Sequence, residues 1–153
     1  MSSGEPAGFD GERAGHRAIP HTADIAIEAW APGMDECVGQ AVLALVESFV
    51  APGAAWKPSD EVAFSVAAAS AEDLLVAVLD EVIYQAEVHG RIPVDTSIDE
   101  RTGATEGRAD VRFATVPAAD VELVGAVPKA VALHELRFAR TGGLWRCHVT
   151  IDV

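Results

Sequence analysis

The sequence is poor in cysteine and has no long hydrophobic run. Its two cysteines, Cys37 and Cys147, lie far apart and match no metal-ligand or redox spacing. This usage is typical of buried thiols in a reducing compartment, and we expect a cytoplasmic protein. The longest nearly uncharged stretch, residues 37–46, is much shorter than the roughly 20 apolar residues that cross a bilayer. We therefore expect neither a membrane-spanning segment nor a membrane partner.

Lysine is also scarce, and acidic residues dominate the charge. Lys57 and Lys129 are the two lysines, and the formal net charge is −13. Proteins that bind RNA or DNA derive most of their affinity from Lys and Arg side chains that neutralise phosphates. We therefore expect no direct nucleic-acid binding, and a protein partner, a metal ion or a small substrate fits this charge better.

The common catalytic and nucleotide-binding motifs are missing too. The chain contains no G-x-x-x-x-G-K-[ST], G-x-G-x-x-G, G-x-S-x-G or H-E-x-x-H sequence. Their absence removes the usual phosphate-binding loops, the nucleophile elbow and the zinc-protease helix from consideration. We therefore do not expect a stand-alone enzyme.

What is present predicts a single domain after a short tail. Residues 1–18 carry Gly, Pro and charges of both signs without an apolar signal-peptide segment, and we expect a disordered tail there and one domain over residues 19–153. Apolar residues that alternate predict half-buried strands, and apolar residues spaced by three and four predict helices. Strands are expected over residues 22–29, 61–69, 91–98, 107–116, 129–138 and 144–153, and helices over residues 38–49 and 71–89.

Turn and capping residues support this division. Ser70 and Gly90 stand where an N-cap and a C-terminal glycine would bound the second helix. The paired glycines in ARTGG, residues 139–143, predict a tight hairpin between the last two strands. Alternating strands favour antiparallel pairing. The predicted fold class is α+β, with a largely antiparallel sheet, or two sheets, and two main helices packed on it.

Two aspartates are candidate ligands for a metal ion. Asp24 lies on the face of the first predicted strand that points away from the core, and Asp152 shares the corresponding face of the last strand with His148 and Thr150. If the two strands are neighbours, the carboxylates could meet and recruit a cation, and the carboxylate or carbonyl of Val153 would add a third oxygen. Such oxygen ligands suit Ca²⁺ or Mg²⁺ better than Zn²⁺. The alternative is two solvated aspartates that never meet.

Three further residues could take part in chemistry, although each has a simpler interpretation. His21 and His134 could act as acids, bases or ligands, but a hydrogen-bonded structural role is more common, and no nucleophile is apparent for them to activate. Lys129 follows Pro128 and could reach a carboxylate or a phosphate. It shares odd numbering with Glu135 and Arg137, so a solvated charged ladder along one strand face is the alternative.

The combination of three segments resembles the archease family. These segments are HTADIAIEAWAPG (residues 21–33), SAEDLLVAVLDEVIYQAE (residues 70–87), and VPKAVALHELRF (residues 127–138) followed by WRCHVTIDV (residues 145–153). The resemblance extends from about Ile19 to Val153. The sequence departs from the family pattern at Ala132 and Leu133, where Thr and Tyr are usual, and at Val78, where Trp is frequent.

The resemblance implies a non-catalytic role. Archeases activate the RtcB-type, GTP-dependent RNA ligase of tRNA splicing and RNA repair, so this protein would promote guanylylation of the ligase histidine and multiple turnover. The family's metal site maps onto Asp24, Asp152 and Val153, with calcium expected and magnesium or manganese as alternatives. The family's required lysine maps onto Lys129, with His21 and Glu135 nearby as partner-activating residues. We expect a monomer or a weak oligomer.

Two other functions remain open at this point. The first, also associated with the family, is a chaperone or specificity modulator for a tRNA methyltransferase. The second is an independent metal-dependent phosphoesterase that would use Asp24, Asp152 and His134. Co-purification with a methyltransferase would favour the first, and turnover of phosphoesters by the protein alone would favour the second.

Overall fold

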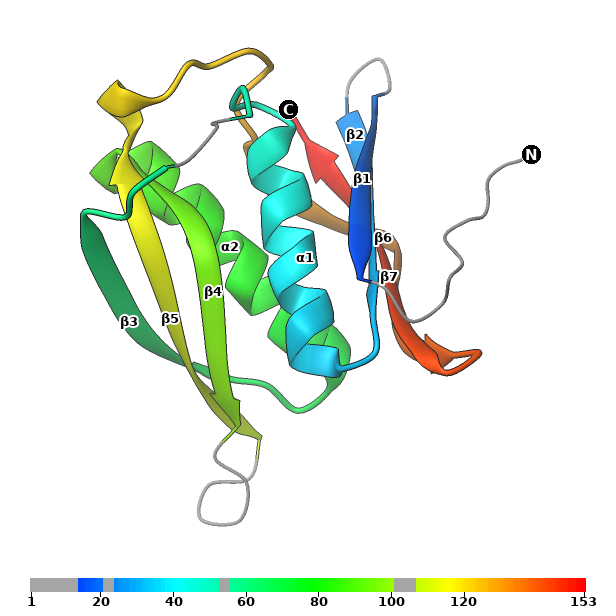
Figure 1. Ribbon diagram of the computed structural model, residues 1–153. Coiled ribbons are helices and arrows are strands. Elements are labelled where there is room, and N and C mark those ends of the chain that lie inside the picture. Colours follow the sequence, from blue (N-terminus) through cyan, green and yellow to red (C-terminus); the bar gives the residue numbers. More distant parts are fainter. Residues whose placement is uncertain (1–13, 21–23, 53–55, 101–106) are drawn as a thin grey trace.

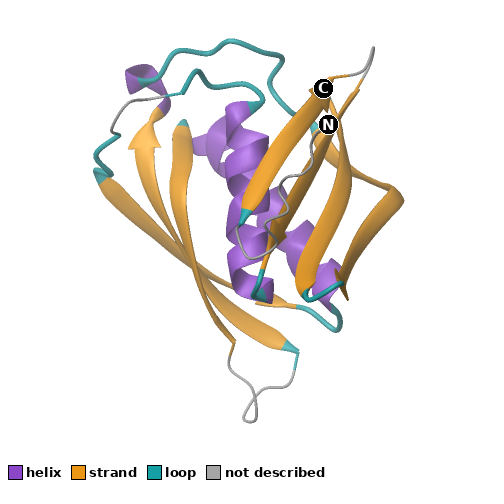
Figure 2. Ribbon diagram, turned by 45° about the vertical axis from the view of Figure 1, so that its right-hand side comes forward, coloured by secondary structure: helices purple, strands orange, loops and turns teal. Residues whose placement is uncertain are grey.

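Two antiparallel sheets enclose a pair of helices, so that the structure has three layers (Figure 1; Figure 2). The structure is a computed structural model and describes residues 14–20, 24–52, 56–100 and 107–153. The predicted α+β class is confirmed, and of the two arrangements left open by the sequence, the chain adopts the one with two sheets.

The larger sheet has the spatial order β1-β2-β7-β6, and the smaller has the order β3-β5-β4. Every neighbouring pair of strands is antiparallel. The helices α1 and α2 lie between the sheets, because α1 contacts β2 on one side and β4 on the other, while α2 contacts β6 and β4. The bounds are β1 (Gly15–Pro20), β2 (Asp24–Ala31), α1 (Met34–Glu47), β3 (Asp60–Ala67), α2 (Ala71–His89), β4 (Arg91–Glu100), β5 (Arg108–Pro117), a 3₁₀ turn (Ala118–Asp120), β6 (Ala130–Thr141) and β7 (Leu144–Asp152).

The second helix begins and ends at the residues that the sequence indicated. The Ser70 hydroxyl accepts a hydrogen bond from the Asp73 backbone N–H at 3.1 Å, which satisfies one of the unpaired donors of the first turn. Gly90 ends the helix in the left-handed conformation, with φ 62°. No helix in the described part of the chain is both long and apolar enough to span a membrane.

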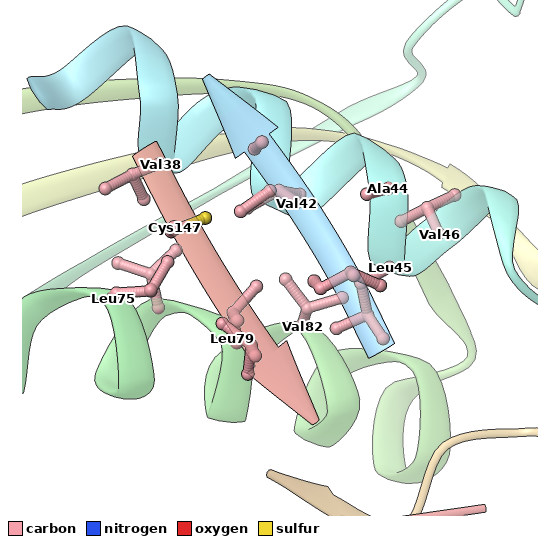
Figure 3. Packing of buried hydrophobic residues seen from close by; sticks show 14 of the residues in the cluster. Val38, Val42, Ala44, Leu45, Val46, Leu75, Leu79, Val82 and Cys147 are labelled. Atoms are coloured by element: carbon pink, nitrogen blue, oxygen red, sulfur yellow. The ribbon is translucent and has the colours of Figure 1, made fainter. Parts of the chain in front are cut away.

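The hydrophobic core fills the space between the helices and both sheets, and Figure 3 shows a part of it that lies against the larger sheet. Figure 3 shows side chains from both helices, including Val42, Leu45, Leu79 and Val82, converging beneath β2 and β7. Leu45, Leu79 and Val82 are fully buried. At roughly 25 cal/mol per Å² of apolar area removed from water, this burial is the main source of stability.

The predicted boundary of the N-terminal tail is wrong by four residues. β1 starts at Gly15 and pairs with β2 along its whole length, so residues 15–18 belong to the larger sheet. The short stretch GHRAIP contains little alternation from which a strand could be read. It is held by main-chain pairing and by His16, whose ring nitrogens lie 2.6 Å from Gln40 Oε1 and 2.7 Å from Glu47 Oε1 on α1.

The last two strands form the expected hairpin. Gly142 and Gly143 make its turn with φ values of 64° and 84°, which only glycine adopts without strain. Because β7 pairs with β2 in antiparallel fashion, the end of β7 lies beside the start of β2. Figure 1 shows both of these strand ends at the same end of the molecule as the last turn of α1.

Candidate functional site

Asp24 and Asp152 form a directly opposed pair across β2 and β7. Their neighbours Ile25 and Ile151 point to the opposite face, toward the core. Directly opposed residues in an antiparallel pair have Cβ atoms about 5 Å apart, so the two carboxylates, called here the carboxylate pair, are close enough to repel one another or to share a cation. The structure therefore brings together two side chains that are remote in the sequence.

The main chain near Lys129 and Val153 adjoins the carboxylate pair. The backbone N–H of Lys129 donates a hydrogen bond to the Asp152 carbonyl oxygen at 2.8 Å. Pro128, just before it, is buried, and the Lys129 side chain is exposed. The side chain of Val153 packs against the core, which holds its main-chain oxygen next to Asp152. Each of these backbone positions is thus fixed relative to the carboxylates.

The alternative of a charged ladder of Lys129, Glu135 and Arg137 is wrong, because a bulge interrupts β6. Ala132 lies opposite Thr150 and Arg137 lies opposite His148, so residues 133–136 face a single residue of β7. The bulge changes which residues face outward: even-numbered positions do so before it, and odd-numbered positions after it. Glu135 within the bulge has φ 61°, an unusual conformation for a residue other than glycine.

The bulge brings His134 and Glu135 over the outer face of the sheet. Both are exposed, and together with Asp24, Ala26, His148 and Thr150 they line a pocket of about 310 Å³. His148 is held by Glu28, since its Nδ1 lies 3.3 Å from Glu28 Oε2. The pocket therefore combines one member of the carboxylate pair with a second carboxylate and two imidazoles.

His21 lies outside the described residues, so the structure does not place it. Within the described ranges, no three His, Cys, Asp or Glu side chains form a group that could hold a metal ion. A cation at the carboxylate pair would therefore need main-chain oxygens, water or ligands from another molecule in addition. This requirement matches the oxygen coordination of Ca²⁺ and Mg²⁺ and not the nitrogen and sulfur ligands that Zn²⁺ prefers.

The pairing of Glu28 with His148 was not predicted from the sequence, although a signal for it was present. Any antiparallel register that places Asp24 opposite Asp152 also places Glu28 opposite His148 and Trp30 opposite Arg146. A register with Asp24 opposite Asp152 was therefore enough to predict which residues lie opposite one another on the outer face of these two strands.

The fold and the site together define a class of protein: a three-layer α+β domain whose larger sheet has an outer face rich in charged and polar side chains, with opposed carboxylates at one end. Comparison with protein families finds a match to the archease protein family over residues 16–153. The chain belongs to the archease family.

Individual relatives agree with this assignment. A Mycobacterium tuberculosis protein named "Probable protein archease" is 48% identical over 147 residues, covering 96% of this chain and 79% of that protein. The "Protein archease" of Archaeoglobus fulgidus is 28% identical over 140 residues, covering 90% and 98%.

Two solved structures have the same fold. The solution structure of Methanobacterium thermoautotrophicum protein 1598 superposes with a TM-score of 0.69 at 19% identity, covering 91% of this chain and 99% of that one. The crystal structure of a Thermotoga maritima archease, described as a possible chaperone, superposes with a TM-score of 0.61 at 23% identity, covering 88% and 94%.

Proposed function

We propose that this protein activates an RtcB-type RNA ligase without itself being the catalyst, promoting guanylylation of the ligase and multiple turnover. Membership of the archease family supports this proposal. The observation that carries it is the cross-strand pairing of Asp24 with Asp152, with Lys129 hydrogen-bonded through its main chain to the same residue. Both carboxylates and the backbone of Lys129 thus lie at one end of the larger sheet, and the Lys129 side chain is exposed.

The carboxylate pair is the proposed site of a divalent cation, calcium in the first instance. Asp24 and Asp152 would supply side-chain oxygens and Val153 a main-chain oxygen. Neither aspartate forms a salt bridge with any residue that the structure describes. A bound cation would therefore relieve the repulsion between the two carboxylates, and this relief favours binding. A bound divalent ion would supply positive charge for phosphate oxygens of the ligase's nucleotide.

Lys129 is proposed to contact those same phosphate oxygens. Its backbone is fixed by the hydrogen bond to Asp152, while its side chain is exposed and free to extend. A lysine ammonium acts as a compact charge that needs no fixed geometry to contact a phosphate. Glu135, which the bulge places over the neighbouring pocket, and His21 would contact the ligase beside it.

The test is a multiple-turnover ligation assay with the host ligase, GTP and excess RNA. The wild-type protein should convert a ligase that stalls after one turnover into a cycling one, and Asp24→Asn and Lys129→Ala should each reduce the multiple-turnover rate at least tenfold. Asp95→Asn and Lys57→Ala are matched controls, because both residues are exposed and lie away from the larger sheet. Equal stimulation by all five proteins would disprove the assignment of the site.

Calorimetric titration with CaCl₂ tests the metal site separately from the ligase. We expect Asp24→Asn to weaken Ca²⁺ binding at least tenfold, equivalent to about 1.4 kcal/mol, because one of two carboxylate ligands becomes neutral. Asp95→Asn should bind as the wild type does. Undiminished affinity in Asp24→Asn would remove the carboxylate pair from the metal proposal and leave the ligase proposal to the ligation assay.

A second candidate function is supported by the description of the Thermotoga maritima relative as a possible chaperone. In this case the protein would assist or modulate a tRNA methyltransferase. No effect on a competent ligase, together with co-purification of a methyltransferase whose activity or specificity changes, would favour this function.

A further inference from the structure

A second pocket lies on the same outer face of the larger sheet, toward the β6–β7 hairpin. It has a volume of about 290 Å³, and three arginines, Arg17, Arg137 and Arg146, are among its lining residues. Glu28, Trp30 and His148 also contribute to the lining. This arginine pocket, defined by Arg17, Arg137 and Arg146, plays no part in the function proposed above.

The strand register assembles the arginine pocket from all four strands. Arg17 lies opposite Glu28, Glu28 opposite His148, and His148 opposite Arg137, so these four residues form one continuous row across β1, β2, β7 and β6. The adjacent row brings Trp30 opposite Arg146. Every member of both rows points away from the core, and the three guanidinium groups therefore gather on one surface.

The arginine pocket has the opposite charge to the rest of the molecule. The chain carries a net charge of −13 and has nine arginines, and among the described residues that line this pocket three are arginines and one, Glu28, is a carboxylate. Glu28 is already engaged, since Arg17 Nε lies 3.1 Å and His148 Nδ1 lies 3.3 Å from its oxygens. Three guanidinium groups on one surface would favour an anion even though the molecule as a whole repels anions.

Trp30 helps to position Arg17. The Arg17 guanidinium lies 5.0 Å from the centre of the Trp30 ring, within the range of a cation–π contact. The ring lies against Gly15, where an added Cβ would come within 2.4 Å of a ring carbon. Only glycine permits this approach, and the ring in turn limits the positions that Arg17 can take.

We propose that the arginine pocket binds a terminal phosphate monoester. Guanidinium groups offer paired donors whose geometry matches phosphate oxygens, and a monoester presents a nearly dianionic group with three such oxygens. A single terminal group fits better than a long polyanion, because a run of phosphates would extend beyond the pocket along a molecule of net charge −13. Along β2, Asp24 and Glu28 are four residues apart, or about 13 Å, so the pocket is distinct from the carboxylate pair.

The experiment is a titration of the full-length ¹⁵N-labelled protein, at fixed ionic strength with EDTA present so that no metal can mediate binding. The probes are inorganic phosphate, GMP, and a five-nucleotide RNA with or without a 3′-phosphate. We expect the Trp30 indole and Arg Nε–H signals to shift with phosphate, and Arg137→Gln to weaken binding at least tenfold. Arg112→Gln is the matched control, since Arg112 is an exposed arginine on the smaller sheet.

The outcomes separate the source of the phosphate and can overturn the proposal. Binding of GMP but of neither RNA identifies a free nucleotide as the ligand. Binding of the RNA that carries a 3′-phosphate, but not of the RNA that lacks it, identifies an RNA end. Equal binding of RNA with and without the terminal phosphate would overturn the proposal in favour of a backbone contact. Binding of an acidic peptide but of no phosphate probe, or equal affinity in Arg137→Gln and wild type, would also overturn it. None of these outcomes depends on the ligase.

Discussion

At the scale of single residues, the two cysteines illustrate how burial changes chemistry. Cys37 on α1 and Cys147 on β7 are both buried free thiols. A hydrogen bond with Cys147, and then burial itself, raise the pKa of Cys37 well above its usual range. The thiol therefore stays protonated and unreactive at neutral pH.

This shift predicts an alkaline loss of stability. Because the pKa of Cys37 is raised in the folded state, its contribution to stability is complete below the unfolded thiol pKa of about 8.5 and is lost as the pH rises further. The free energy of unfolding of the wild type should fall by up to about 1.4 kcal/mol more per pH unit than that of Cys37→Ala above this pH. Urea denaturation between pH 8 and 10.5 measures both slopes, and parallel slopes would contradict the assignment.

At the scale of elements, the bulge in β6 decides which side chains reach the candidate site. Glu135 has φ 61°, a conformation that costs about 1 kcal/mol for a residue with a Cβ atom and little for glycine. The surrounding sheet compensates for this cost. The bulge moves His134 and Glu135 over the pocket beside Asp24.

Substitution of Glu135 separates the strain of the bulge from the role of its carboxylate. Glu135→Gly should be more stable than Glu135→Ala by about 1 kcal/mol in urea denaturation, because glycine relieves the left-handed backbone. Both variants lack the carboxylate, so both should reduce stimulation of the ligase to the same extent. If stimulation instead follows stability across the two variants, the carboxylate has no direct role.

At the scale of the whole molecule, a single core joins the layers, and the protein should unfold as one unit. Leu79 on α2 is fully buried between the sheets, and Leu79→Ala should lower the free energy of unfolding by about 2–5 kcal/mol because it leaves a cavity. Val88→Ala on the same helix is the control, since Val88 is 57% exposed and should change stability by only about 0.5 kcal/mol. One transition with an unchanged urea dependence is expected for both.

Local patterns were sufficient to predict most of the elements and the faces of the two strands that carry Asp24 and Asp152. The helix from Ala71 to His89 was readable because its apolar spacing, its Ser70 cap and its Gly90 stop agree with one another. The orientation of Asp24 and Asp152 followed from alternation alone, since successive strand residues point to opposite faces. The β6 bulge was not readable, because extra residues in one strand leave no mark in a pattern until the partner strand is known.

The sequence by itself determined the α+β class, the buried stripes, the hairpin at Gly142 and Gly143, and the outward direction of each aspartate, since all of these depend on spacing within a few residues. Only the tertiary structure decided that β7 lies beside β2, and this single pairing sets Asp24 against Asp152 and Glu28 against His148. It also decided that β1 completes the row that gathers Arg17 and Arg137. The physical reason is that strand order is chosen by how the whole apolar surface can be buried at once, which no local segment encodes.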